Sequence, residues 1–178
     1  VSVTTSLPGK PTVNTLTLVS KTYNSITVKM SGAYGTGHPS GVYGYYRVKL
    51  STQSSWTKVS NYSAHAITGL SPNTAYTVQC QLVDYYGQVS DTKTLAVTTA
   101  LPALPSGGTV SVSEITHKSA KMTYSGFKAG AGASIARYDV AMRPEPGNVA
   151  WTNNGLNTSY TGTGLPPNTY CIARVTAV

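Results

Sequence analysis

The sequence predicts an all-β chain of two tandem β-sandwiches, the second of which lacks its last strand. The sequence contains an internal repeat. Val97–Pro102 repeats Val3–Pro8 at an offset of 94 residues, and Leu165–Thr169 repeats Leu70–Thr74 at an offset of 95. Both repeats consist of short alternating or β-branched runs between clusters of Gly, Pro, Asn and Ser. A period of this size, found at independent places, indicates a tandem array of one small domain, and such arrays provide reach, spacing and contact.

Seven strands are expected in the first repeat, each with alternating apolar residues or with several β-branched residues. In chain order they cover residues 12–19, 26–30, 45–50, 56–59, 64–68, 76–83 and 95–99. Seven short strands in about 90 residues is the spacing of a β-sandwich. No segment has a sustained helical period, so no helix is predicted.

The second repeat follows the same order of strands. The aligned segments are Ser119–Tyr124 with Ser25–Met30, Tyr138–Met142 with Tyr46–Leu50, and Trp151 with Trp56. Val178 aligns with Val83, so the counterpart of the strand at 95–99 is missing. We therefore expect one domain at residues 8–99 and a second, incomplete domain at residues 100–178.

Residues 1–7 belong to neither expected domain. Val1–Thr5 aligns with the last strand of the first repeat, Leu95–Thr99, although it precedes that repeat. We expect it to be the end strand of a preceding repeat, or a linker. Alternatively, this strand completes the open sheet edge of the second repeat in another molecule, because an uncovered edge is a template for strand addition.

The run Leu70–Val78, which is Leu-Ser-Pro-Asn-Thr-Ala-Tyr-Thr-Val, resembles the turn between strands E and F of the fibronectin type III family. Trp56 stands at the place of that family's strand C′, and Trp151 has the corresponding place in the second repeat. The resemblance covers the whole chain and implies two immunoglobulin-like β-sandwiches. It also implies that Tyr76 packs inward while its hydroxyl group bonds back to the chain, with Trp56 and Trp151 as further structural residues.

Two positions depart from the family pattern. The family usually has a Trp on strand B, where this chain has Met30 and Tyr124. Both side chains can fill a core, so we expect the packing to differ and the fold to remain. In the second repeat Cys171, and not Tyr170, aligns with Tyr76. Either the tyrosine corner is lost there, or the turn is one residue shorter.

Charge is sparse and unbalanced. Charged residues make up 10% of the chain, against about 25% in an average soluble domain, and Ser and Thr supply polarity instead. The formal net charge is +8, which favours acidic partners such as a polyanionic glycan. The cations are scattered along the sequence, so no specific nucleic-acid site is predicted. No apolar run is long enough to span a membrane.

The sequence offers no catalytic or metal-binding pattern. Its acids and histidines form no pair that recurs in both repeats, and motifs for hydrolases, phosphate binding and zinc are missing. Asp84 and Asp91 flank one loop, but two carboxylates are too few for a calcium site. Each repeat has one cysteine, Cys80 or Cys171, which excludes a disulfide within a domain, and Cys80 is expected to be a small buried apolar side chain. We therefore predict no enzyme activity, cofactor or metal.

Two Asn-x-Ser sequons follow the two tryptophans at similar distances. Asn61 and Asn157 are thus candidate glycosylation sites on exposed loops. A chain this rich in Ser and Thr also contains such sequons by composition alone, so the two asparagines remain candidates.

The loops that follow strands B and F lie at the same end of a fibronectin type III domain. This places Tyr34 and His38 beside Tyr85 and Tyr86, which are the candidate binding residues. Tyr, Ser and Gly in adjacent loops are typical of adaptable binding surfaces, because tyrosine supplies contact area at low entropic cost. The alternative is that Gly and Ser turn the chain and the tyrosines cover the end of the sandwich.

Together these features predict a non-catalytic structural or adhesion segment of an extracellular, cell-surface or virion-surface protein. Its tandem domains would act as a spacer and mediate protein contact or assembly. The expected partners are other repeats of the same protein, neighbouring copies, or a cell-surface protein or glycan. Two alternatives stay open: an accessory spacer region of a secreted polysaccharide-degrading enzyme, and a structural component of a virus or phage surface.

Overall fold

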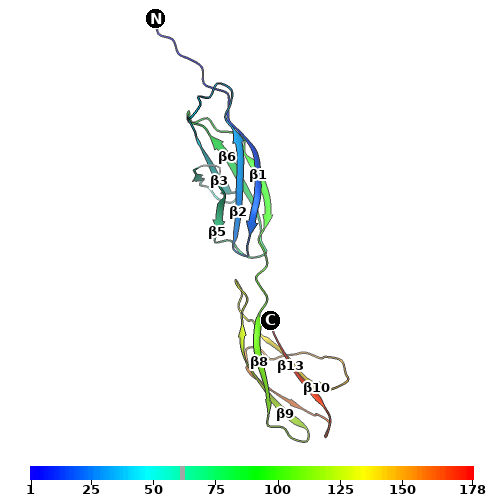
Figure 1. The fold of residues 1–178 in the computed structure, drawn as a ribbon. Helices are drawn as coiled ribbons and strands as arrows, with labels where there is room; N and C mark the ends of the chain where they lie inside the picture. The colour runs from blue at the N-terminus through cyan, green and yellow to red at the C-terminus, as the bar shows by residue number, and fades with distance from the viewer. Residues whose placement is uncertain (61–62) are drawn as a thin grey trace. The chain divides into compact units, whose positions relative to one another are not determined.

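The computed structural model describes residues 1–60 and 63–178, which form two compact units, Val1–Leu101 and Pro102–Val178. Every regular element among these residues is a β-strand, and all the strand pairs are antiparallel (Figure 1). No described residue belongs to a helix with the length and hydropathy that crossing a membrane requires.

The first unit is a sandwich of two sheets. The first sheet contains, in order, β1 (Thr12–Lys21), β2 (Ser25–Ala33) and β5 (His65–Thr68). The second sheet contains, in order, β4 (Thr57–Val59), β3 (Tyr45–Leu50), β6 (Ala75–Val83) and β7 (Lys93–Thr98). The chain crosses from one sheet to the other between β2 and β3, between β4 and β5, and between β5 and β6, so both sheets contribute to one core.

Alternation along the central strands produces that core. Every second residue along most of β2, β3 and β6 is buried, while the residues between them are more exposed. Burying one such side chain contributes about 1.5–3 kcal/mol. The buried residues are Ile26, Val28 and Met30 on β2, Tyr46, Val48 and Leu50 on β3, and Val78, Cys80 and Leu82 on β6.

The second unit repeats this plan with one strand fewer. One sheet contains, in order, β12 (Ser159–Thr163), β9 (Ser119–Lys128) and β8 (Ser106–Ser113), and the other contains β11 (Thr152–Asn153), β10 (Tyr138–Pro144) and β13 (Cys171–Ala177). β13 pairs with β10 along one edge, and no described residue pairs with its other edge. No counterpart of β7 lies among the described residues, as predicted.

The buried core of the second unit is smaller than that of the first unit. Met122, Tyr124 and Val140 form the buried cluster of the second unit, so both replacements of the family's tryptophan, Met30 and Tyr124, fill core positions. β8 is exposed at every residue, whereas its counterpart β1 buries Leu16. In the first unit β7 contacts β1, and no described strand takes that place in the second unit.

All seven strands predicted for the first repeat occur. β3 has the predicted bounds, and the ends of the others differ by at most three residues. The largest difference is at β2, which continues to Ala33 because β1 pairs with Gly32 and Ala33. Strand ends depend on such partners from elsewhere in the chain, whereas the alternation that predicts a strand is local.

Tyr76 holds the turn between β5 and β6. Its hydroxyl oxygen accepts a hydrogen bond from Ser71 N–H at 2.9 Å, and its ring packs against the core. Asn73 adopts the left-handed conformation, with φ 46°, which asparagine tolerates better than most residues. From the other side Thr99 Oγ1 donates to Ser71 O at 2.7 Å and accepts from Thr74 N–H at 2.9 Å. The turn is therefore fixed by β6 and by the end of β7.

The equivalent turn of the second unit has the same shape but no tyrosine corner. Asn168 is left-handed, with φ 52°, at the position of Asn73. Cys171 occupies the position of Tyr76 on β13, and Tyr170 is 75% exposed. Of the two alternatives that the sequence left open, the turn keeps its length and the corner is lost.

The two cysteines differ in their surroundings, and both are free thiols. Cys80 is fully buried on β6, and burial raises the pKa of its thiol to about 11 in spite of an opposing effect of Lys93. Cys171 is only partly buried. Because the thiolate is the reactive form, Cys80 is chemically inert at neutral pH.

Tyr76→Ala should lower the free energy of unfolding of the first unit by about 3 kcal/mol, because it removes a packed ring and the acceptor of Ser71 N–H. Tyr76→Phe should lower it by about 1 kcal/mol, since only the hydroxyl group is lost. Urea denaturation followed by Trp56 fluorescence in a Trp151→Phe background measures both changes. The matched control is Tyr170→Ala, which removes an exposed tyrosine from the equivalent turn and should change stability by less than about 0.5 kcal/mol. A Tyr76→Ala protein as stable as its parent would contradict this role of Tyr76.

Iodoacetamide at pH 8 should alkylate Cys171 in the folded chain and leave Cys80 unmodified, because Cys80 is buried and protonated at that pH. In guanidinium chloride both thiols should react. Peptide mass spectrometry identifies the modified cysteine at each time point. Equal rates for the two cysteines in the folded chain would show that the core around Cys80 opens readily.

Candidate functional site

Two loops at one end of the first unit carry a group of aromatic side chains. Residues 34–44 connect β2 to β3, and residues 84–92 connect β6 to β7. In the second loop Gly87 N–H donates to Asp84 O at 3.2 Å, and Gly87 has φ 83°, which glycine adopts without strain. Tyr85 and Tyr86 occupy the two central positions of this turn, so their side chains reach solvent.

Rings from the two loops contact one another. Tyr34 and His38 stack with ring centres 4.5 Å apart and an interplanar angle of 20°, and Tyr43 lies 6.4 Å from Tyr34. His38 meets Tyr86 edge-on at 5.8 Å, and Tyr86 meets Tyr85 edge-on at 5.5 Å. Such a pair contributes about 0.5–1.5 kcal/mol beyond its buried area. These five residues, Tyr34, His38, Tyr43, Tyr85 and Tyr86, are called the tyrosine surface below.

Hydrogen bonds fix the two inner members of the tyrosine surface. Tyr34 Oη accepts from Gly44 N–H at 2.8 Å. His38 Nδ1 donates to Pro39 O at 3.2 Å, so Nε2 carries the lone pair of the neutral ring. Nε2 is buried and has no hydrogen-bond partner among the described residues. His38 therefore acts as a packing ring between two tyrosines and is not placed to take a proton from a substrate.

The second loop is held by a buried carboxylate. Asp84 is 3% exposed, and its two oxygens accept from Gln88 N–H at 2.7 Å and from Gln88 Nε2 at 3.0 Å. At the base of the loop Leu82 N–H donates to Ser90 Oγ at 2.9 Å. Within the described residues no three His, Cys, Asp or Glu side chains lie close enough to share a metal ion. Asp84 thus stabilises the loop.

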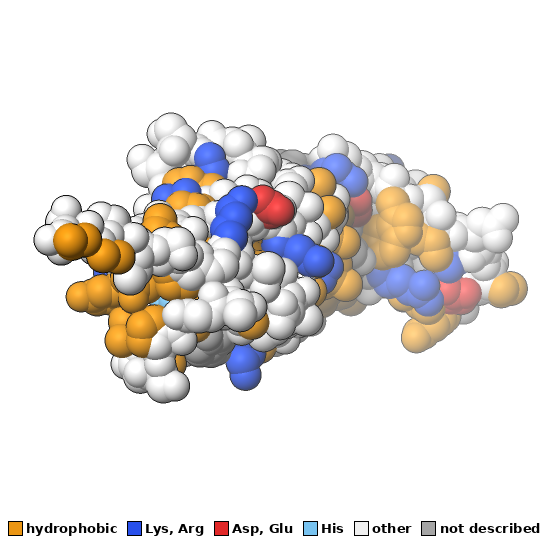
Figure 2. Space-filling view, turned by 90° about the horizontal axis from the view of Figure 1, so that it is seen from above, with side chains coloured by type: hydrophobic (Ala, Val, Ile, Leu, Met, Phe, Trp, Pro, Cys, Tyr) orange, Lys and Arg blue, Asp and Glu red, His pale blue; other side chains and the backbone are white. Residues whose placement is uncertain are grey.

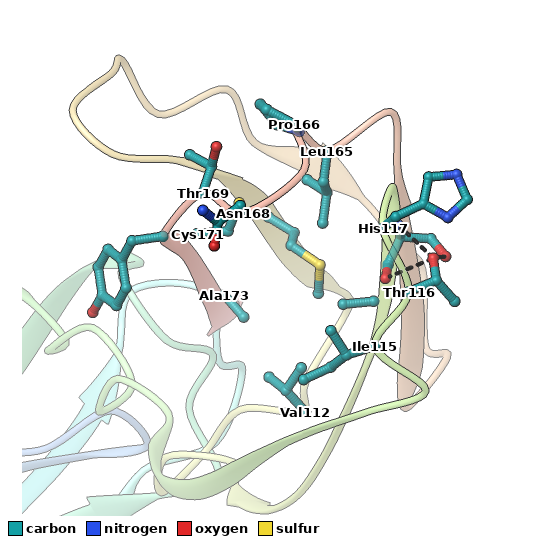
Figure 3. A pocket seen from close by; sticks show the side chains of 14 residues that line it. Val112, Ile115, Thr116, His117, Leu165, Pro166, Asn168, Thr169, Cys171 and Ala173 are labelled. Atoms are coloured by element: carbon teal, nitrogen blue, oxygen red, sulfur yellow. Dashed lines mark hydrogen bonds between the residues drawn. The ribbon is translucent and has the colours of Figure 1, made fainter.

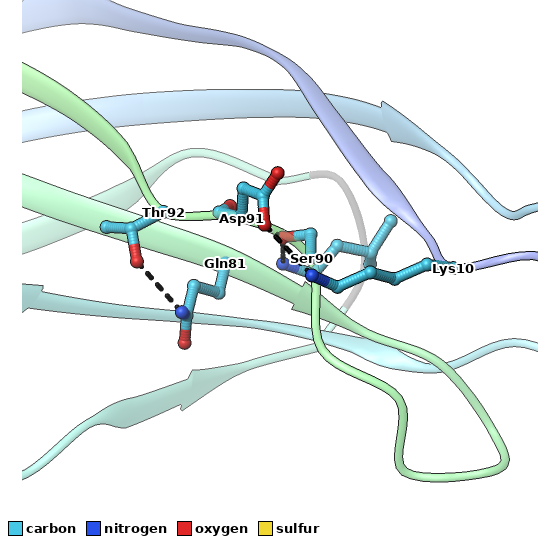
Figure 4. Close-up of polar contacts among 6 residues, drawn as sticks. Lys10, Gln81, Ser90, Asp91 and Thr92 are labelled. Carbon is cyan, nitrogen blue, oxygen red and sulfur yellow. Dashed lines mark hydrogen bonds and ion pairs between the residues drawn. The ribbon is translucent and has the colours of Figure 1, made fainter.

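The segment Pro8–Lys10 ties the two loops together. Gly9 N–H donates to Thr36 O of the first loop at 2.9 Å. Pro8 O accepts a hydrogen bond from Gln88 Nε2 of the second loop at 3.1 Å. Lys10 forms an ion pair with Asp91 at 2.9 Å (Figure 4). The hydrogen bond from Lys10 in that pair lowers the pKa of Asp91. Because both loops contact this one segment, their positions relative to each other are fixed.

The outer members of the tyrosine surface are accessible to a partner. Tyr43 is 70% exposed, Tyr85 67% and Tyr86 43%. Viewed from this end, hydrophobic side chains gather around a histidine (Figure 2). A hollow of about 390 Å³ lies beside Tyr86, bounded by Thr36, Gly37 and residues 5–8. Phenol rings on a fixed frame offer flat apolar faces and hydroxyl groups, which can stack on sugar rings or pack on a protein surface.

The fold brings together all four candidate binding residues predicted from the sequence. The fifth member, Tyr43, was not among the predicted binding residues. A signal was present, since Tyr43 is out of phase with the buried residues Tyr46 and Val48 of β3, and alternation places it outside.

Trp56 lies on the outer face of the second sheet, next to β4, and not in the core. The guanidinium carbon of Arg47 lies 4.9 Å from its ring centre, and the ammonium of Lys49 lies 5.1 Å from it. On the same face Lys58 lies 4.2 Å from the ring centre of Tyr45. Each such pair contributes about 0.5–1 kcal/mol at an exposed site. Alternation along β3 thus gathers cations that appear scattered in the sequence.

The remaining predicted residues lie elsewhere. Trp151 is 47% exposed, precedes β11 and takes no part in the buried cluster of the second unit. Asn61 lies outside the described residues. Asn157 is exposed, and its Nδ2 donates to Asn154 O at 2.9 Å. Glycosylation of both asparagines stays a prediction.

Solved structures resemble the chain, whereas no family model matches its sequence. A two-domain fibronectin type III segment of chicken tenascin is 17% identical, with a TM-score of 0.50 over 96% of this chain and 100% of that chain. The FN1–FN3 domains of chicken CNTN1 are 15% identical, with a TM-score of 0.40 over 96% of this chain and 60% of that one. The chitinase ChiA74 from Bacillus thuringiensis is 17% identical, with a TM-score of 0.43 over 93% of this chain and 29% of the chitinase.

Three observations now agree on the fold. The first unit packs the sheet β1-β2-β5 against the sheet β4-β3-β6-β7, and Tyr76 makes the hydrogen bond expected of the family's corner tyrosine. The tenascin segment matches over its full length. The chain therefore consists of two tandem domains with the fibronectin type III fold, the second of which has six strands among the described residues.

Proposed function

We propose that this chain is a non-catalytic spacer segment of an extracellular or surface protein, and that the tyrosine surface of its first domain contacts a protein or glycan partner. The tandem fold supports the spacer role, because a series of small folded domains can separate two parts of a protein. The composition, poor in charge and rich in Ser and Thr, is consistent with an extracellular location.

One observation carries the proposed contact role. Tyr43, Tyr85 and Tyr86 are exposed at one end of the domain. Each of them packs against a neighbouring ring: Tyr43 against Tyr34, Tyr86 against His38, and Tyr85 against Tyr86. A bulky exposed side chain that is already held in place loses little conformational entropy when a partner covers it. Packing alone does not require Tyr43 and Tyr85 to be exposed to this extent, so a partner is the physical reason that fits best.

The non-catalytic role has support of its own. His38 is held between tyrosine rings with its lone pair buried, Asp84 is bonded to Gln88, and Cys80 is buried and protonated. None of these three groups has the access to a substrate that a nucleophile or general base needs.

The fluorescently labelled chain should bind at least one member of an array of immobilised neutral polysaccharides, sulfated polysaccharides and glycoproteins. A Tyr85→Ala, Tyr86→Ala double variant should bind about 30-fold more weakly, because loss of interface aromatics costs about 2 kcal/mol. Glycoproteins spotted before and after enzymatic deglycosylation separate the two partner classes: a glycan partner loses binding on deglycosylation, and a protein partner keeps it.

Tyr170→Ala is the matched control, since it removes an exposed tyrosine from the second domain and should leave binding unchanged. Equal binding by the double variant and its parent, or no binding to any member, would contradict the contact role of the tyrosine surface. Release of reducing sugar from any polysaccharide on the array would contradict the non-catalytic role.

A further inference from the structure

The outer face of the second sheet in the first domain carries three cations that lack a carboxylate partner. Alternation along β3 places Arg47 and Lys49 on this face, and Lys58 of β4 lies directly opposite Arg47. The two acids of this domain, Asp84 and Asp91, belong to the loop between β6 and β7. No ion pair within the described residues involves any of the three cations. Arg47, Lys49 and Lys58 are called the cationic face below.

The fold does not require this concentration of charge. Like charges directly opposite each other on paired strands are destabilising, and Arg47 and Lys58 form such a pair. The corresponding residues of the second domain carry no positive charge, although two of them pair in the same way: Asp139 for Arg47, Asn153 for Lys58 and Ala141 for Lys49. The same order of strands therefore forms without these cations, and their presence in the first domain points to a partner that supplies negative charge.

Aromatic rings hold the cations at this face. The guanidinium of Arg47 and the ammonium of Lys49 lie against the ring of Trp56, and the ammonium of Lys58 lies against the ring of Tyr45. Such a ring attracts a cation through its quadrupole but leaves the net charge in place. The cations are therefore positioned before a partner arrives, which lowers the entropic cost of binding an anion.

Hydrogen bonds extend the cationic face into a polar row across the sheet. Arg47 Nε donates to Gln81 Oε1 at 2.8 Å, and Gln81 Nε2 donates to Thr92 Oγ1 at 2.8 Å (Figure 4). The two terminal nitrogens of Arg47 donate to no described residue. With Lys58 at one end and Thr92 at the other, the row crosses four strand positions, a length of about 14 Å. A linear polymer can contact several groups of this row at once.

We infer that the cationic face binds a sulfated polysaccharide, whose chain lies along this row. Sulfate groups supply the negative charge that the protein lacks here, and the terminal nitrogens of Arg47 can bind one of them through two hydrogen bonds. Gln81 and Thr92 offer neutral polar groups to the sugar hydroxyls. A single-stranded nucleic acid fits less well, because bases stack on open aromatic faces and the rings of Trp56 and Tyr45 already carry cations.

Two other surfaces lack the charge to bind this partner. The tyrosine surface contains no Lys or Arg. A hollow of about 430 Å³ in the second domain is lined largely by apolar and amide side chains, such as Val112, Leu165 and Asn168, and no Lys or Arg is among the described residues that line it (Figure 3). Binding at the cationic face is therefore independent of the contact role proposed for the tyrosine surface.

Titration calorimetry of the full chain with heparin, a sulfated polysaccharide, tests the inference at physiological ionic strength. Heparin should bind, and chemically desulfated heparin should bind about tenfold more weakly, because it lacks the charges that the cations attract. A Lys49→Ala, Lys58→Asn double variant takes the residues of the second domain at these positions and should bind heparin about tenfold more weakly than the parent. A Lys49→Arg, Lys58→Arg double variant keeps the charge and should bind heparin like the parent.

The matched control is a Lys29→Ala, Lys118→Ala double variant, which lowers the net charge by the same amount at exposed residues of the other sheet and of the second domain. It should bind heparin as the parent does. The Tyr85→Ala, Tyr86→Ala variant should also bind heparin like the parent, because the tyrosine surface takes no part in this contact. Thermal unfolding shows that each variant is folded before it is titrated.

Four results would overturn the inference: no binding of heparin, equal binding of desulfated heparin, equal losses in the control variant and the Lys49→Ala, Lys58→Asn variant, or a loss in the tyrosine variant. A single-stranded oligonucleotide that binds more tightly than heparin would overturn the assignment of a polysaccharide. Heparin binding that depends on the cationic face, with no other partner found on the array, would contradict the contact role of the tyrosine surface and support this inference.

Discussion

The alternation of side chains along the central strands is the constraint on which the rest of this structure depends. Successive residues of a strand face opposite sides, so β3 puts Tyr46 and Val48 into the core and Arg47 and Lys49 on the outer face. A shift of one residue would bury the cations and expose the core. The register of the sheets is therefore strongly determined. This register also fixes the end of the sandwich at which each loop lies.

The tyrosine surface is built on that frame by polar contacts that hydrophobic patterning does not encode. The buried carboxylate of Asp84 shapes one loop through Gln88, and the segment Pro8–Lys10 connects that loop to the other. The aromatic rings then pack across the gap between the loops. A surface held in this way exposes tyrosine side chains while their neighbours restrict their motion.

The two domains share one order of strands, and one of their differences lies at the corner turn. Tyr76 pairs with Val97 of β7, so the corner tyrosine and the last strand are neighbours in the first domain. The second domain has Cys171 in place of the tyrosine and no strand at that edge. The turn itself keeps its shape, as the left-handed Asn168 shows.

Alternation and internal repetition are local properties of the chain, and they were sufficient to predict the fold class and the order of the strands. The sequence also identified four of the five members of the tyrosine surface, since turn residues mark the loops. Other features became visible in the folded chain alone: which rings touch, the packing role of His38, the position of Trp56 outside the core next to Arg47 and Lys49, and the loss of the second corner. These outcomes depend on contacts between residues far apart in the chain, such as Lys10 with Asp91, which no local pattern specifies.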